Sequence, residues 1–127
     1  MTMPAGKYWV GDLCYVMENH WDEVCLVTVE DGECLEGEFS LASDVRFAMY
    51  RRAHDDMGYL QKNDYEYSVD SGTIGCVRVE DIDDPRAEYE RGSAHEFSED
   101  FETGSEGGVV RFGDVSVNTN SYVKDSI

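Results

Sequence analysis

The sequence YEYSVDSGTIGCVRVE at residues 65–80 decides the fold class of this chain. Two segments rich in aromatic and β-branched residues, 65–69 and 73–80, flank the triplet Asp70-Ser71-Gly72. Such a triplet is typical of a tight turn, because the Asp side chain caps local amides and Gly accepts a positive φ. The pattern predicts two strands joined by a hairpin.

The residues before this stretch continue the strand pattern. In residues 45–51, Val45, Phe47 and Met49 alternate with Arg46, Ala48 and Tyr50, which predicts a strand with two distinct faces. Residues 38–41 and 58–61 are further strand candidates, and residues 62–64 (KND) form a second turn signal. An antiparallel meander with hairpin connections is the simplest topology.

The N-terminal third adds one helix to this pattern. Residues 7–17 (KYWVGDLCYVM) predict a strand with a bulge, or two short strands around a tight turn at Gly11 and Asp12. Residues 19–29 (NHWDEVCLVTV) predict a short helix, capped by Asn19, that runs into extended chain.

The C-terminal third begins with a change of composition. Residues 81–108 form an acidic, partly exposed connecting region, with a short helix near 86–91 and a short extended piece at 97–101. Residues 109–119 predict a final strand or hairpin, because Val115 and Val117 alternate with polar residues and imply one buried face.

The predicted fold class is mainly β, with α+β possible. We expect a compact antiparallel sheet, sandwich or partly open barrel with one or two short helices, and a single domain over residues 1–127. The 127-residue length and the apolar fraction of 41% suffice for one core. Disorder is not expected, because the chain holds many aromatic and β-branched residues.

The charge is the strongest functional clue in the sequence. The formal net charge is -18, and residues 80–106 contribute eleven acids and two arginines, a net -9. A field of this sign opposes direct binding to DNA or RNA, which requires a basic surface. No long apolar run or secretory signal pattern is present, so we expect no membrane partner and a cytoplasmic location.

Three segments carry a resemblance: residues 8–16 (YWVGDLCYV), 69–76 (VDSGTIGC) and 111–115 (RFGDV). Together they resemble a group of small uncharacterised proteins of tailed phages and bacteria, whose first motif usually reads Gly-Asp-Pro-Cys-Tyr. Here Leu13 stands at the proline position. The resemblance implies a phage or bacterial origin and brings no assigned activity. The residues of the shared structural motifs are Gly11, Asp12, Cys14, Asp70 and Gly72.

Catalytic and metal sites have weaker support. Asp12, Cys14 and His20 are the nearest approach to a nucleophile with a base, but a strongly acidic protein disfavours a thiolate, so no enzyme is predicted. No close Cys or His pair predicts zinc. Residues 80–84 (EDIDD) group oxygen ligands without matching a calcium loop, and a solvated acidic loop is the simpler interpretation. No cofactor is expected.

Two functions follow from the charge. The first is a phage-like acidic interaction protein that inhibits a basic nucleic-acid-handling host protein by DNA mimicry, of the anti-restriction or anti-CRISPR type. The second is a non-catalytic ligand- or protein-binding β domain whose acidity reflects a saline host, with Tyr8, Trp9, Tyr15 and Trp21 lining its surface. The predicted partner-binding residues of the first are Asp81, Asp83, Asp84, Glu88, Glu90, Glu99, Asp100 and Glu102.

Overall fold

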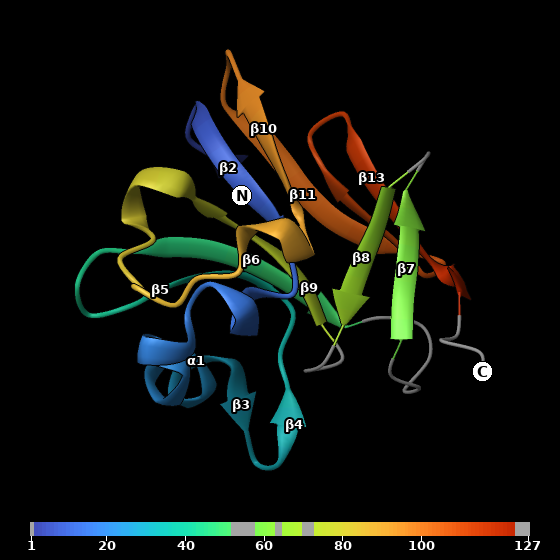
Figure 1. Cartoon of the computed structure of the whole chain (residues 1–127). Helices are drawn as coiled ribbons and strands as arrows, with labels where there is room; N and C mark the ends of the chain where they lie inside the picture. The colour runs from blue at the N-terminus through green and yellow to red at the C-terminus, as the bar shows by residue number, and fades with distance from the viewer. Residues whose placement is uncertain (1, 52–57, 63–64, 70–72, 124–127) are drawn as a thin grey trace.

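A computed structural model of the chain describes residues 2–51, 58–62, 65–69 and 73–123. Its strands form two open antiparallel sheets and a small β ribbon (Figure 1). The six-stranded sheet contains, in spatial order, β1 (Thr2–Met3), β11 (Phe101–Glu106), β12 (Val109–Phe112), β13 (Val115–Val123), β7 (Gly58–Lys62) and β8 (Tyr65–Val69). The five-stranded sheet contains β10 (Ser93–Phe97), β2 (Gly6–Gly11), β9 (Thr73–Arg78), β6 (Arg46–Arg51) and β5 (Gly37–Ser40).

The mainly β prediction is confirmed, and the strands that the structure describes do not close into a barrel. The β ribbon pairs β3 (Val29–Glu30) with β4 (Glu33–Cys34). Within the described residues the chain forms one α-helix, α1 (Trp21–Thr28). The same residues form four 3₁₀ turns: η1 (Leu13–Tyr15), η2 (Glu18–His20), η3 (Val79–Asp81) and η4 (Tyr89–Arg91).

The first core cluster lies between the two sheets. Tyr8, Ala48 and Cys76 come from the five-stranded sheet, and Phe112 and Val117 come from the six-stranded sheet. Val115 and Val117 are buried while Asp114 and Ser116 are exposed, so the predicted alternation in this hairpin is confirmed. The six-stranded sheet therefore has one buried and one exposed face where its side chains are described.

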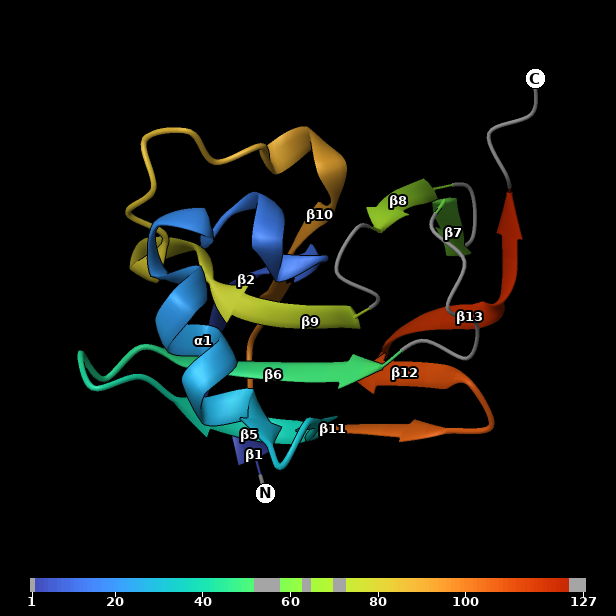
Figure 2. The same cartoon turned by 90° about the horizontal axis from the view of Figure 1, so that it is seen from below.

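The second core cluster covers the opposite face of the five-stranded sheet. Trp9, Phe47 and Val77 project from the strands to meet Leu13 of η1 and Val24 of α1. Figure 2 shows α1 and the segments next to it lying across β6 and β9. The central strands are thus buried on both faces, which explains why they are apolar almost throughout.

The strand pairing differs from a meander. β5 pairs with β6 and β7 pairs with β8, as predicted, but β9 lies between β2 and β6 in the other sheet. The predicted hairpin between β8 and β9 is therefore wrong. Residues 63–64 and 70–72, including Asp70 and Gly72, lie outside the described part of the chain.

Two local predictions for the N-terminal third need correction. After β2 the chain forms η1 rather than a second strand, because Asp12 caps that turn. The short helix followed by extended chain is confirmed, but Asn19 lies within η2 and does not cap α1. No described helix is long and apolar enough to span a membrane.

The region 81–108 contributes to both sheets. β10 pairs with β2, and β11 pairs with β1 and β12. The predicted short helix near 86–91 is observed as η4, while the extended piece expected at 97–101 is the turn between β10 and β11 with one strand on each side.

Candidate functional site

The Gly11-Asp12-Cys14 motif forms a buried turn. Asp12 is fully buried, and its Oδ1 accepts a hydrogen bond of 3.1 Å from the Cys14 backbone amide. Leu13, at the proline position of the resembling proteins, is fully buried against Gly75, where a Cβ atom would meet its side chain at 2.8 Å. Both residues fix the end of β2 against η1.

The three cysteines whose side chains are described lie in different surroundings. Cys14 is half-buried, and its backbone amide donates a hydrogen bond to Asp12. The candidate base His20 lies with its Nε2 2.9 Å from Asp83 Oδ1. Burial raises the pKa of the Cys76 thiol well above its usual range. Cys25 is half-buried, and the side chain of Cys34 lies outside the described part of the structure.

The acidic loop, defined as residues 79–92, packs on the helical side of the five-stranded sheet. Asp84 is buried, and its carboxylate accepts hydrogen bonds from the Asn19 amide (3.3 Å) and the Arg86 amide (2.8 Å). The exposed Asp83 accepts hydrogen bonds from Asn19 Nδ2 and lies against His20. The hydrogen bonds from Asn19 and then His20 lower the pKa of Asp83. Asp84 is thus a structural residue. The prediction that it forms part of the partner-binding surface is therefore wrong.

The rest of the acidic loop is also tied to the fold. The Glu88 amide donates to the Tyr15 carbonyl at 2.8 Å, and Trp9 Nε1 donates to the Tyr89 carbonyl at 3.0 Å. Burial and the neighbouring Glu80 raise the pKa of Asp81, which is half-buried. Glu90 is exposed, so only part of the predicted set in this loop faces solvent.

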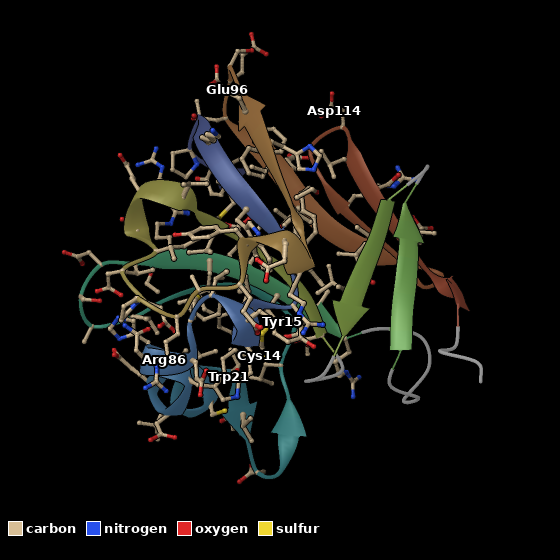
Figure 3. The ribbon with its side chains drawn as sticks, in the orientation of Figure 1. Cys14, Tyr15, Trp21, Arg86, Glu96 and Asp114 are labelled. Atoms are coloured by element: carbon tan, nitrogen blue, oxygen red, sulfur yellow. The ribbon has the colours of Figure 1, made fainter. Side chains whose placement is uncertain are left out.

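A second acidic group lies at the turn between β10 and β11. Glu99 and Asp100, both predicted, are exposed there together with Glu96 and Asp114. These four residues, which we call the acidic tip, line a hollow of about 200 Å³. Figure 3 places Glu96 and Asp114 at neighbouring ends of the two sheets, away from Arg86.

The acidic tip rests on packed aromatic rings. Phe97 and Phe101 stack with their centroids 3.9 Å apart, and Tyr8 meets the edges of both. Gly113, with a φ of 64°, brings the β12–β13 turn over these rings, where a Cβ atom would meet Phe97 at 2.9 Å. Glycine therefore lets Asp114 approach the β10–β11 turn.

Sequence reasoning missed Glu96 and Asp114 as members of this site. The pair Gly113-Asp114 between alternating segments was a usable turn signal, but nothing local says that this turn meets residues 98–100. Glu102, which was predicted, is exposed on β11 opposite Thr2. It follows the acidic tip along the outer side of the six-stranded sheet.

Arg46 of β6 takes part in the fold. Arg46 lies 3.4 Å from Glu38 and donates to the Thr2 carbonyl at 2.9 Å. The Glu38 side chain is only 5% exposed and accepts a hydrogen bond from Thr103, which also contacts the Tyr50 hydroxyl. Arg51 is exposed, and Arg52 lies outside the described residues.

The aromatic residues of the second predicted function do not form an open surface. Tyr8 and Trp9 are buried core residues, and Tyr15 and Trp21 are half-buried against the second cluster. The Arg91 guanidinium lies over the Tyr15 ring at 5.2 Å. A recognition surface built from these four rings is therefore not present.

No three or more His, Cys, Asp or Glu side chains are grouped to hold a metal ion within the described ranges. His95 Nε2 contacts Ser93 Oγ at 2.7 Å, and His54 lies outside those ranges.

Comparison of the chain with known protein families, curated proteins and solved structures finds no match.

Proposed function

We propose that this protein is a non-enzymatic binding protein that inhibits a nucleic-acid-handling host protein by occupying its Lys- and Arg-lined groove. The acidic tip is the contact surface, and Glu102 extends it along β11. The origin is phage-like, the partner is of the restriction or CRISPR type, and the site of action is the host cytoplasm. Neither direct nucleic-acid binding nor membrane binding is part of this function.

The observation that carries the proposal is the grouping of four exposed carboxylates around one hollow on a rigid support. Duplex DNA presents one charge per about 1.7 Å of axis, so a protein surface that replaces it needs several carboxylates fixed close together. The stacked rings below the acidic tip anchor its backbone to the core, and a surface anchored in this way loses less entropy on binding. The net charge of -18 adds long-range attraction toward a basic groove.

The test uses capture followed by competition. The protein is immobilised, exposed to bacterial host lysate at low salt, and the retained proteins are identified by mass spectrometry and purified. We expect a retained nucleic-acid-binding protein that is released by high salt and also by duplex DNA, because DNA and the acidic tip compete for one groove.

A matched pair of variants makes the test specific. The tip variant carries Glu96→Gln, Glu99→Gln and Asp114→Asn, and the control carries Asp22→Asn, Glu30→Gln and Glu106→Gln. Both change the net charge from -18 to -15, since three carboxylates are neutralised, and all six residues are exposed. Asp100 is kept because its Oδ1 accepts the Ala5 amide. Equal retention of the partner by the two variants would refute the role of the acidic tip.

A further inference from the structure

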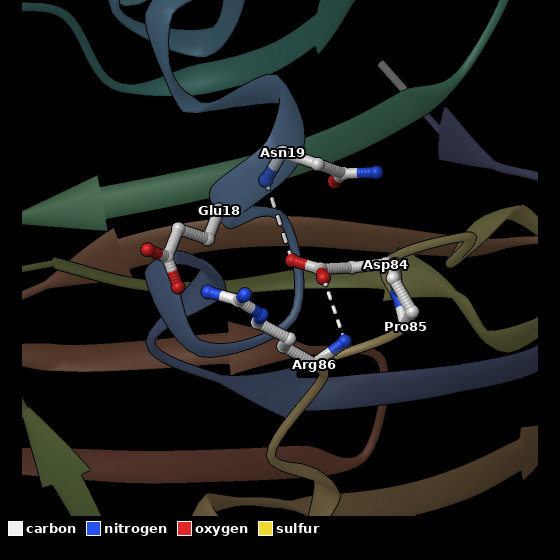
Figure 4. A pocket seen from close by; sticks show the side chains of 5 residues that line it. All are labelled: Glu18, Asn19, Asp84, Pro85 and Arg86. Atoms are coloured by element: carbon white, nitrogen blue, oxygen red, sulfur yellow. Dashed lines mark hydrogen bonds between the residues drawn. The ribbon is translucent and has the colours of Figure 1, made fainter.

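A second hollow, of about 290 Å³, lies between η2 and the acidic loop, away from the acidic tip. Its lining residues are Glu18, Asn19, Asp84, Pro85 and Arg86 (Figure 4). The volume is near the lower end of the range for small-molecule sites, about 300 Å³. It is large enough for a small metabolite.

The floor of this hollow is fixed before any ligand arrives. Asp84 joins its two sides, because one oxygen accepts the Asn19 amide and the other accepts the Arg86 amide. The Asn19 side chain donates a hydrogen bond of 3.0 Å from its Nδ2 to Asp83 Oδ1. Pro85 restricts the backbone between Asp84 and Arg86.

The charges of the lining are of both signs. Figure 4 shows the Arg86 guanidinium extending toward the Glu18 carboxylate, with Asp84 between Asn19 and Arg86. Neither Glu18 nor Arg86 is in an ion pair with any residue that the structure describes. The two exposed charges are therefore available to a ligand that carries one group of each sign.

We propose that this hollow binds a free α-amino acid. The guanidinium of Arg86 receives the α-carboxylate, since its planar fork matches a carboxylate with two parallel hydrogen bonds. The α-ammonium group lies between the carboxylates of Glu18 and Asp84, and Pro85 forms an apolar wall. This site is independent of the function proposed for the acidic tip.

The negative electrostatic potential around the hollow determines which amino acids bind most tightly. Two carboxylates and one guanidinium leave the hollow itself negative, and the whole molecule carries -18. Amino acids with a basic side chain are therefore favoured over acidic ones, with arginine ahead of glutamate. The α-carboxylate remains necessary, because it is the group that Arg86 recognises.

The test is an amide NMR titration of the full chain with L-arginine, L-arginine amide and N-acetyl-L-arginine. We expect saturable shifts at Asn19 and Arg86 with a dissociation constant of about 1 mM, and binding at least about five-fold weaker for each analogue. Arginine amide separates this site from general attraction to an acidic protein, because it carries more positive charge than arginine and still binds less well.

The variant Arg86→Gln provides the second test, with Arg111→Gln as its control. Both residues are exposed and both changes make the protein more negative by one charge. Arg86→Gln is expected to weaken arginine binding about ten-fold or more, whereas Arg111→Gln leaves it unchanged. Arginine binding that is equal or tighter in Arg86→Gln, or tighter binding of arginine amide to the unchanged protein, would overturn the proposal.

Discussion

The acidic loop and three of the four acidic-tip residues come from the same acidic run of sequence, residues 80–106, yet their carboxylates act differently. In the acidic loop, Asp84 is buried on two backbone amides and Asp83 contacts Asn19 and His20. At the acidic tip, Glu96 and Glu99 are exposed around a hollow. The comparison teaches that a buried carboxylate which accepts two backbone amides stabilises the fold, whereas exposed carboxylates grouped around a hollow offer their charge to a partner.

The largest effect is expected for Asp84→Ala in the acidic loop. Removal of this carboxylate leaves the Asn19 and Arg86 amides without their acceptor, and we expect the free energy of unfolding to fall by about 2–3 kcal/mol. Urea unfolding followed by circular dichroism measures the change. Glu99→Ala at the acidic tip is the control and should stay within about 0.5 kcal/mol of the unchanged protein. Equal losses in the two variants would remove the distinction between the regions.

The next largest effect is expected for the affinity between the acidic tip and the captured partner. The tip variant is expected to bind its captured partner at least about ten-fold more weakly, about 1.4 kcal/mol, with unchanged unfolding. The loss should lie largely in the association rate at low salt, because steering acts before contact. Stopped-flow binding measures it. A control variant that loses as much would show that total charge, and not the acidic tip, determines binding.

A smaller effect is expected for Asp83→Asn in the pH dependence of stability. The hydrogen bonds from Asn19 and His20 lower the folded-state pKa of Asp83 below its ordinary value of 3.8, so they stabilise the fold fully above that value. Stabilisation is lost as the pH falls through the lower, folded-state pKa. Unfolding measured at about pH 5 and about pH 3 should therefore differ between the two proteins at the higher pH, and the difference should be smaller at the lower pH. A constant difference would contradict this contribution.

The smallest effect is expected from salt on stability. Between 0.1 M and 1 M KCl the Debye length falls from about 10 Å to 3 Å, which screens the exposed acidic tip but not the short hydrogen bonds of Asp84. We expect the free energy of unfolding to change by less than about 1 kcal/mol, while partner binding weakens strongly. A large gain of stability in molar KCl would instead indicate adaptation to a saline host.

The strands could be predicted from local pattern, but their partners could not. Alternation located β6 and the β12–β13 hairpin, because each residue's face follows from the period of two. The place of β9 beside β2 depends on the fit of Leu13 over Gly75, which joins residues far apart in the sequence. Local turn chemistry at residues 70–72 carries no information about that contact.

The sequence by itself determined the mainly β class, the short helix and the acidity of residues 80–106, since these depend on composition and short-range periodicity. Only the tertiary structure decided which carboxylates are structural and which are exposed. Asp84 meets Asn19 from a distant segment, and Gly113 brings Asp114 to the β10–β11 turn. Burial and hydrogen bonding are set by such distant contacts, so the roles of the acidic residues could not be read from their order along the chain.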